Sequence, residues 1–259
     1  MPELTITLAT CCRNRTEHLK QTLPCNLKDN PQDYVRFLLV NYNSQDDMDE
    51  WVRSELMQFI PSGKLMYVHE KTADRFKHAH ARNLAVRCCQ TDVFCNLDAD
   101  NYTGPGFGQW LRKFYLDQTK AAFTAYGGRC RGAPSGDMFG RISFQTKALL
   151  ALGGYNEDLN VWGVEDWDVI YRALQAGYAQ GEYPTEFDTK AIHHSNKSRV
   201  VGTGQDSPRK TMEKTAKILL GKYSMQQQPN AKGQWGKAHV TVNWEKEVEL
   251  PLKAGEQLP

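Results

Sequence analysis

At 259 residues, the chain is long enough to bury one sizeable hydrophobic core. Its 40% hydrophobic and 24% charged residues are typical of a globular protein, and its formal net charge of +2 argues against nucleic acid or an anionic membrane as the main partner. No signal peptide is recognisable and no apolar run approaches the roughly 18 residues of a membrane span, so we expect a soluble protein. The cysteines, which suit reduced thiols, favour a cytoplasmic one, with a trimmed Golgi luminal domain as the alternative.

Short apolar runs alternate with helical patterns through the first hundred residues. The runs predict strands, and the patterns between them predict helices, the first of which has Thr16 as its N-cap. We expect strands at 6–9, 37–40, 65–68 and 93–97, and helices at 17–27, 49–59 and 80–89. This alternation predicts an α/β fold whose parallel sheet carries helices on both faces and binds ligands at the carboxyl ends of its strands.

The second half of the chain is less regular. Gly177 marks the end of one predicted helix, and Ser207-Pro208 marks the start of another that should end before Gly221. We expect strands at 142–144 and 240–242, and helices at 147–152, 165–176 and 207–220.

The seven cysteines include no C-x-x-C pair, which argues against a structural zinc site. Their odd number and two adjacent pairs suit no disulfide framework, so we expect reduced thiols that pack as small apolar groups.

Three D-x-D triplets occur in the chain. Asp47-Met48-Asp49 lies in a polar turn, where capping and solvation explain its carboxylates. Asp98-Ala99-Asp100 ends a predicted buried strand, where two hard oxygen donors suit Mg²⁺ or Mn²⁺. An Asx turn at the strand end explains the second triplet equally well from position alone.

The third triplet lies within a segment that also holds Glu165, at the start of a predicted helix. Helical geometry predicts that Glu165 and Asp168 share one face and that Asp166 points elsewhere. Helix capping explains at least one of these acids. The flanking Trp162 and Trp167 are typical of a sugar-stacking wall, and a carboxylate beside an apolar surface is a candidate general base with a raised pKa.

Five blocks of the sequence together resemble inverting GT-A glycosyltransferases, closest to the β-1,4-galactosyltransferases and chondroitin-polymerase-like enzymes. The opening R-N-R-T-E-H-L-K run is similar to the nucleotide-contacting run of these families, and Val164 stands where their W-G-G-E-D-x-D element usually has a second glycine. The blocks, in the family's order, are residues 6–20, 76–85, 93–101, 162–168 and 192–195.

The resemblance implies a GT-A fold, a Rossmann-like, mostly parallel sheet flanked by helices, with a C-terminal helical and irregular extension. It implies a nucleotide-sugar-binding half at 1–101, an acceptor and catalytic half at 102–205, and the extension at 206–259. Asp166 would be the catalytic base, and Glu165 would hydrogen-bond a substrate sugar.

The resemblance also implies the binding residues. Mn²⁺ or Mg²⁺ would be held by Asp98, Asp100 and His194, with His193 as the alternative because adjacent histidines on a strand point to opposite faces. Trp162 and Trp167 would contact acceptor sugar. The donor nucleotide sugar would be bound by Thr10, Arg13, Arg15, Tyr42, Asp46, Lys77, Arg82, Asp98 and Asp100. Tyr42 departs from the family, which has a base-reading aspartate there; a tyrosine could instead stack on the base.

We therefore expect a metal-dependent, inverting transfer from a nucleotide sugar, a UDP-sugar first of all, to a hydroxyl of a glycan or lipid-linked saccharide. A binding module without turnover and a retaining transferase on the same fold are the alternatives; Glu165-Asp166 favours inversion, because related retaining enzymes tend to carry asparagine after that glutamate. Segments 127–140 and 197–206 are candidate lids, the second with Lys197 and Arg199 for phosphate. The lysine-rich helix in the extension is either a solvated face or a peripheral membrane contact.

Overall fold

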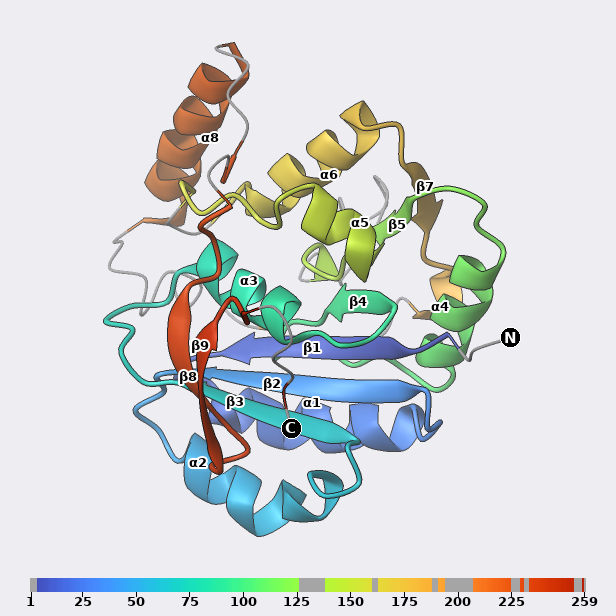
Figure 1. The fold of residues 1–259 in the computed structure, drawn as a ribbon, viewed down its shortest axis with the longest axis vertical. Coiled ribbons are helices and arrows are strands. Elements are labelled where there is room, and N and C mark those ends of the chain that lie inside the picture. The colour runs from blue at the N-terminus through green and yellow to red at the C-terminus, as the bar shows by residue number, and fades with distance from the viewer. Residues whose placement is uncertain are drawn as a thin grey trace.

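The computed structural model describes residues 4–125, 138–159, 163–187, 191–193, 207–224, 229–230, 233–253 and 258. The described strands form one nine-stranded sheet in the order β7-β5-β6-β4-β1-β2-β3-β8-β9 (Figure 1). Its centre holds four parallel strands: β4 (Val93–Asn96), β1 (Ile6–Cys12), β2 (Val35–Tyr42) and β3 (Leu65–Glu70). The predicted parallel sheet is confirmed there.

Antiparallel pairings extend this centre on both sides. On one side, β6 (Ser143–Gln145) pairs with β4 and β5 (Ala122–Ala125), and β7 (Ala179–Glu182) lies parallel to β5. On the other side, β8 (Ala238–Val242) pairs with β3, and β9 (Lys246–Leu250) pairs with β8. Strands from all three predicted parts of the chain therefore share one sheet.

The helices agree with the predicted ones in number and place through the first half. They are α1 (Thr16–Asp29), α2 (Met48–Trp51), which continues as short irregular turns to Phe59, and α3 (His78–Cys88). The second half adds α5 (Thr146–Ala151), α6 (Glu165–Gln175) and α8 (Pro208–Ser224) as predicted, together with the unpredicted α4 (Phe107–Leu116). Helix α8 runs through Gly221, where the sequence predicted an end, because a single glycine only weakens a helix.

The predicted N-cap of α1 is wrong. Thr16 is already inside the helix, and Arg15 precedes it without a side-chain cap. The Thr16 amide instead donates to Asp46 Oδ2 at 2.9 Å, so the cap comes from the segment after β2. A carboxylate near the positive end of the helix dipole is favourable wherever it lies in the sequence.

Two hydrophobic layers cover the two faces of the sheet. Alternate residues of β1 point to opposite faces: Ile6 and Leu8 pack with α1, α2 and α4, whereas Ala9 packs with α3, α5 and α6. Figure 1 shows α3, α5 and α6 above β1, and α1 and α2 below β2 and β3. The six described cysteines are free thiols, as expected.

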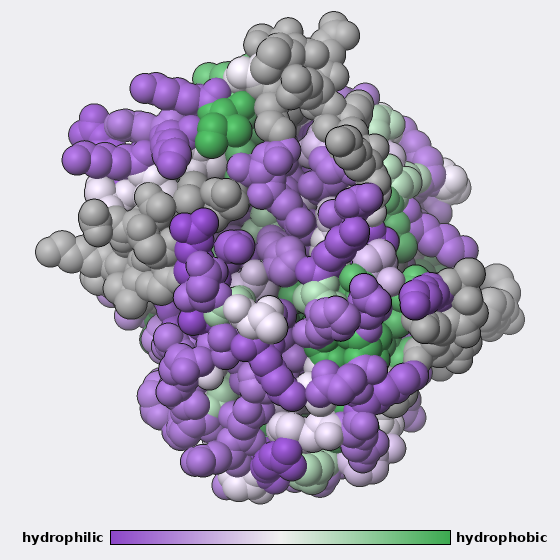
Figure 2. Space-filling view, turned by 60° about the vertical axis from the view of Figure 1, so that its left-hand side comes forward, coloured by the Kyte–Doolittle hydropathy of each residue, from purple (hydrophilic) through white to green (hydrophobic). Residues whose placement is uncertain are grey.

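The C-terminal strands lie on the side of the molecule that Figure 2 turns forward, where hydrophilic side chains predominate and most apolar ones gather in a recessed patch. Trp235, before β8, is 4% exposed, and the Arg87 guanidinium of α3 lies 3.5 Å from its ring centroid. This part of the extension, from Trp235 to β9, is thus packed against the core of the fold. No helix among the described residues is long and apolar enough to cross a membrane.

Candidate active site

The Asp98-Ala99-Asp100 segment follows β4 at the carboxyl edge of the parallel strands, as predicted. Two side chains of α1 hold its backbone: Thr22 Oγ1 donates to the Ala99 carbonyl at 2.7 Å, and Asn26 Nδ2 donates to the Asn101 carbonyl at 2.9 Å. Both of these α1 residues are buried. The position of the D-x-D segment is therefore fixed by the packing of α1 against the sheet.

A late segment of the chain reaches the same place. Asn101 forms an antiparallel bridge with Ala191, and the Ile192 amide donates to the Asp100 carbonyl at 2.8 Å. His193 follows directly and is exposed. The structure therefore brings the late histidine segment next to Asp98-Ala99-Asp100, although about ninety residues separate them in sequence.

Arg82 on α3 gathers three carboxylates that are distant in sequence. Its Nη1 lies 2.6 Å from Asp166 Oδ1 and 3.3 Å from Glu165 Oε1, and its Nη2 lies 3.4 Å from Asp98 Oδ1. The guanidinium is buried and lies 5.3 Å from the centroid of the Tyr155 ring. One cation facing three carboxylates leaves an excess of negative charge when all three are ionised, which favours a further cation nearby.

Burial changes the protonation of two of these acids. It raises the pKa of Asp166 to about 8; the Arg82 guanidinium opposes this rise, and Glu165 and Asp98 add to it. Burial also raises the pKa of Glu165. A carboxylate whose pKa lies near neutral pH is suited to general base catalysis.

The burial of the acids at the start of α6 agrees with the predicted face: Glu165 and Asp168 are buried, and Asp166 is less so. Their partners divide differently, because Glu165 and Asp166 share Arg82, whereas Asp168 lies 2.7 Å from Arg172 Nη2. One long guanidinium reaches two adjacent side chains at the helix start. The i, i+4 pairing with Arg172 directs Asp168 into the core.

Val164, immediately before α6, has a φ of 65° in the left-handed region. A branched side chain rarely adopts this conformation, which costs a non-glycine residue roughly 1–2 kcal/mol. This is the position where the resembling enzymes usually carry glycine. The turn at Val164 starts α6 at Glu165 and Asp166, which both lie against Arg82.

Arg13 holds the loops at the edge of the sheet together. Its guanidinium donates to the carbonyls of Tyr42, Ala73 and Asp74 at 3.0, 2.7 and 3.1 Å. Thr10 is buried within β1, so its side chain lies inside the fold. Both residues were predicted to contact the donor. In this structure Arg13 binds backbone carbonyls and Thr10 is buried in the sheet, so both support the loops around the site.

Tyr42 is 1% exposed, and its hydroxyl lies 2.6 Å from His80 Nδ1. Its ring packs edge-on against Phe76. The structure therefore presents no open face of Tyr42 on which a nucleobase could stack, because tertiary packing places this strand residue in the core.

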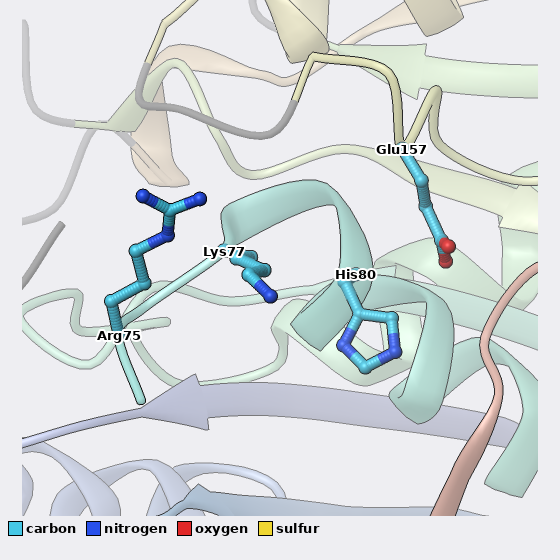
Figure 3. Close-up of a pocket in the computed structure, with 4 residues that line it drawn as sticks. All are labelled: Arg75, Lys77, His80 and Glu157. Carbon is cyan, nitrogen blue, oxygen red and sulfur yellow. The ribbon is translucent and has the colours of Figure 1, made fainter. Parts of the chain in front are cut away.

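Lys77 and Arg15 lie just before helices. Lys77 precedes α3 and lines a pocket with Arg75, His80 and Glu157 (Figure 3). The lining residues include none of the Arg82 cluster. Arg15 precedes α1 and is half-buried, and its carbonyl accepts the His18 amide at 3.0 Å.

The described metal-ligand candidates are Asp98, Asp100 and His193. The Asp98 side chain is 34% exposed, whereas Asp100 is 6% exposed and its Oδ1 accepts Asn101 Nδ2 at 2.6 Å. Within the described ranges, no three histidine, cysteine or acidic side chains converge as a metal site. The hard oxygen donors and the excess negative charge at Arg82 nevertheless suit a divalent cation.

Several predicted site residues lie outside the described residues: Trp162, His194, Lys197, Arg199 and all but the last three positions of the candidate lid 127–140. Trp167 is described. It is 49% exposed on α6, and its ring centroid lies 4.8 Å from that of Phe139. The two rings form an aromatic surface at the start of α6.

Gly140, the last residue of the predicted lid segment 127–140, allows the chain to approach Asp98 closely. A Cβ at this position would overlap Asp98 Oδ2 and lie 2.9 Å from Arg82 Nη2. The Gly140 carbonyl also accepts Asn96 Nδ2 at 2.8 Å, and the same amide reaches Asp98 Oδ1 at 3.1 Å. The only sequence signal for this role is a glycine next to the strand that pairs with β4.

We expect Gly140→Ala to displace the Asp98 carboxylate and to lower kcat/KM for sugar transfer by about 10²-fold, the effect of an ångström-scale misplacement. Steady-state kinetics and a melting curve will check this. Gly221→Ala, in α8 with open space around its Cβ position, is the matched control and should keep normal kinetics. Normal transfer by Gly140→Ala would show that Asp98 is not needed at its present position.

Comparisons with known proteins agree with this architecture. Residues 132–197, about a quarter of the chain, match the family model described as the N-terminal domain of galactosyltransferase. The mannosyltransferase PcManGT from Pyrobaculum calidifontis, solved with GDP-Man and Mn²⁺, superposes with a TM-score of 0.59 and 20% identity over 85% of this chain and 75% of that one. The chain therefore has the GT-A fold of these glycosyltransferases.

Two further structures share the GT-A fold. S. aureus TarS has a TM-score of 0.59 and 12% identity, covering 89% of this chain and 41% of that chain. GalNAc-T7, solved with UDP, GalNAc and Mn²⁺, has a TM-score of 0.55 and 14% identity, covering 71% of this chain and 43% of that one. A comparison with curated protein sequences finds no match.

Proposed function

We propose that the protein is a metal-dependent, inverting glycosyltransferase that moves a sugar from a nucleotide sugar to a hydroxyl of a saccharide acceptor. The observation that carries the proposal is the cluster of Asp98, Glu165 and Asp166 around Arg82 at the carboxyl edge of the sheet. Ligands of parallel α/β sheets bind at this edge. The match of residues 132–197 to a galactosyltransferase family covers Glu165 and Asp166 and supports the same chemistry.

Asp166 is the proposed general base. Its raised pKa makes it able to take the proton of an acceptor hydroxyl as that oxygen attacks the anomeric carbon from the face opposite the nucleotide. Arg82 holds the carboxylate in place with a 2.6 Å contact, and Glu165 beside it accepts a hydrogen bond from a substrate sugar. Trp167, exposed on the same helix, offers an aromatic face for the acceptor.

Asp98 and Asp100, with His194 or His193, are proposed to hold Mn²⁺ or Mg²⁺. Their oxygen and imidazole donors suit either ion, which would neutralise the charge on the leaving nucleoside diphosphate. The structures with similar folds contain Mn²⁺ with GDP-Man and with UDP, which supports a nucleoside diphosphate donor of this kind. The acceptor is proposed to be a glycan or a lipid-linked saccharide, with α8 as a peripheral contact for the latter.

Metal removal tests this function. We expect EDTA to abolish nucleotide release from a panel of UDP-, GDP-, CMP- and dTDP-sugars, and added Mn²⁺ or Mg²⁺ to restore it, because the Asp98 and Asp100 carboxylates repel a diphosphate unless a cation lies between them. The product anomer, read by NMR, should be inverted. A retained anomer would assign the retaining alternative, and metal-dependent donor binding without turnover would assign a binding module.

A further inference from the structure

A pocket of about 260 Å³ lies beside the N-terminus of α3, outside the Arg82 cluster. Its lining is charged: Arg75, Lys77, His80 and Glu157 (Figure 3). Pockets for drug-sized molecules measure roughly 300–1,000 Å³, so this one suits a group of about monosaccharide size.

The pocket opens on a different flank of α3 from the catalytic cluster. His80 and Arg82 are two residues apart on the helix, which turns their side chains about 200° from each other. His80 Nδ1 lies 2.6 Å from the Tyr42 hydroxyl and its Nε2 lies 3.0 Å from the Lys237 carbonyl, whereas Arg82 contacts Asp166. A ligand here would therefore be separate from the reacting groups.

The cations of this pocket lack strong partners in the fold. Within the described part of the chain, Arg75 makes no hydrogen bond or ion pair, and its Nε is shielded from solvent. Lys77 reaches only the exposed Asp74, at 3.8 Å. Both lie at the positive end of the α3 dipole, whose first turn contains no acid and no side-chain cap. Two cations at this end are unfavourable without an anion, so the arrangement favours an anionic ligand.

Glu157 adds a negatively charged side chain to the pocket, opposite in sign to Arg75 and Lys77. Its Oε1 accepts Asn83 Nδ2 at 2.8 Å and the Gly236 amide at 2.7 Å, which fixes the carboxylate next to His80. Figure 3 shows Arg75 and Lys77 on one side of the pocket, and His80 and Glu157 on the other. A carboxylate accepts hydrogen bonds from hydroxyls and repels anions, so only one orientation of an anionic polyol is favourable.

We propose that this pocket is a subsite for an anionic sugar unit of the acceptor, phosphorylated or carboxylated, an inference that rests on the proposed glycosyltransferase function. The anionic group binds Arg75 and Lys77, and the ring hydroxyls bind Glu157, while His80, whose two ring nitrogens contact Tyr42 and Lys237, forms part of the wall. The acceptor would then be an acidic saccharide, with the unit next to the one that reacts, or one further along, held on this flank of α3.

Calorimetry on the full chain with EDTA and without donor tests the subsite separately from catalysis. We expect glucose 6-phosphate or glucuronate to bind at least tenfold more tightly than glucose and than inorganic phosphate, and the better of the two identifies the anionic group. Arg75→Gln removes no internal contact and should weaken that binding at least tenfold. Arg36→Gln, an exposed arginine at the opposite end of β2, is the matched control and should bind normally.

Equal binding of glucose, no binding of either acid, or unchanged binding by Arg75→Gln would overturn the proposal. Inorganic phosphate binding as tightly as the sugar acids would also overturn it, since hydroxyl recognition would then be absent. UDP or GDP with Mn²⁺ should not displace the sugar acid; displacement would place the pocket within the donor site instead. Sugar-acid binding without any transfer from nucleotide sugars would contradict the proposed function and leave the subsite standing.

Discussion

Asp166→Asn is expected to lower kcat for sugar transfer by roughly 10²–10⁴-fold, the usual contribution of a general base. The amide keeps the shape of the side chain but cannot accept the acceptor's proton. Because Asp98 and Asp100 are unchanged, the Kd of the nucleotide with Mn²⁺ should stay near normal. Single-turnover transfer and calorimetric titration of the nucleotide separate the two effects.

The protein should also remain folded. The pKa of Asp166 is raised from an ordinary value near 3.9 to about 8, so this group makes the native state less stable as the pH rises from about 4 to about 8, above which the loss is complete. A neutral amide avoids that cost, and Arg82 keeps its contacts with Glu165 and Asp98. Glu165→Gln is the matched variant, and a larger rate loss there than in Asp166→Asn would exchange the proposed roles of the two acids.

The same base gives the activity of the wild type a pH dependence. Only ionised Asp166 accepts a proton, so kcat/KM should rise about tenfold per pH unit below its pKa of about 8 and level off above it. Residual transfer by Asp166→Asn should lack this rise. A wild-type profile that is already flat from pH 5 upward would contradict a base with a raised pKa.

Asp168→Asn, two residues further along α6, is expected to lower stability, whereas Asp166→Asn lowers activity. The expected loss is about 3–5 kcal/mol of unfolding free energy. Arg172 bridges α6 to the turn after α5: its Nε and Nη2 contact Asp168 Oδ2 at 2.8 and 2.7 Å, and its Nη1 and Nη2 each donate at 2.7 Å to the carbonyls of Leu152 and Gly154. Loss of the carboxylate charge leaves this buried guanidinium without a counter-ion.

Urea denaturation measures the loss, and a fall of the melting temperature by several degrees should accompany it. Asp117→Asn, on the exposed end of α4, is the matched control and should change stability by less than about 0.5 kcal/mol. If Asp168→Asn unfolds at the same urea concentration as the wild type, the buried pair does not stabilise α6 as proposed.

The parallel centre of the sheet was predictable because its signals are local. Strands that are buried on both faces are rich in apolar residues, and β1 to β4 each contain an apolar run and are buried along most of their length. The edge strands carry weaker signals. Strand β7 has the sequence AQGE, and the β8–β9 turn places Asn243 and Trp244 at φ values of 52° and 60° without the glycine that marks most hairpins.

In the site too, some features were predictable from the sequence and others were not. The sequence predicted that Asp98, Glu165 and Asp166 belong to one site, because the order of the blocks resembles a known family and the strand ends share an edge. It assigned Arg82 to the donor nucleotide, whereas Arg82 lies between the three carboxylates. It offered Tyr42 as a stacking surface, although the ring is buried.

The sequence by itself determined the α/β class, the parallel centre and the acids at the ends of β4 and α6, since these depend on periodicity and on residue types within short segments. Only the tertiary structure decided which acid faces which partner. Asp166 and Asp168 have the same chemistry and lie two residues apart, but one reaches Arg82 at the edge of the sheet and the other reaches Arg172 in the core. Burial and the nearest cation set the role of each, and both are properties of packing between distant segments.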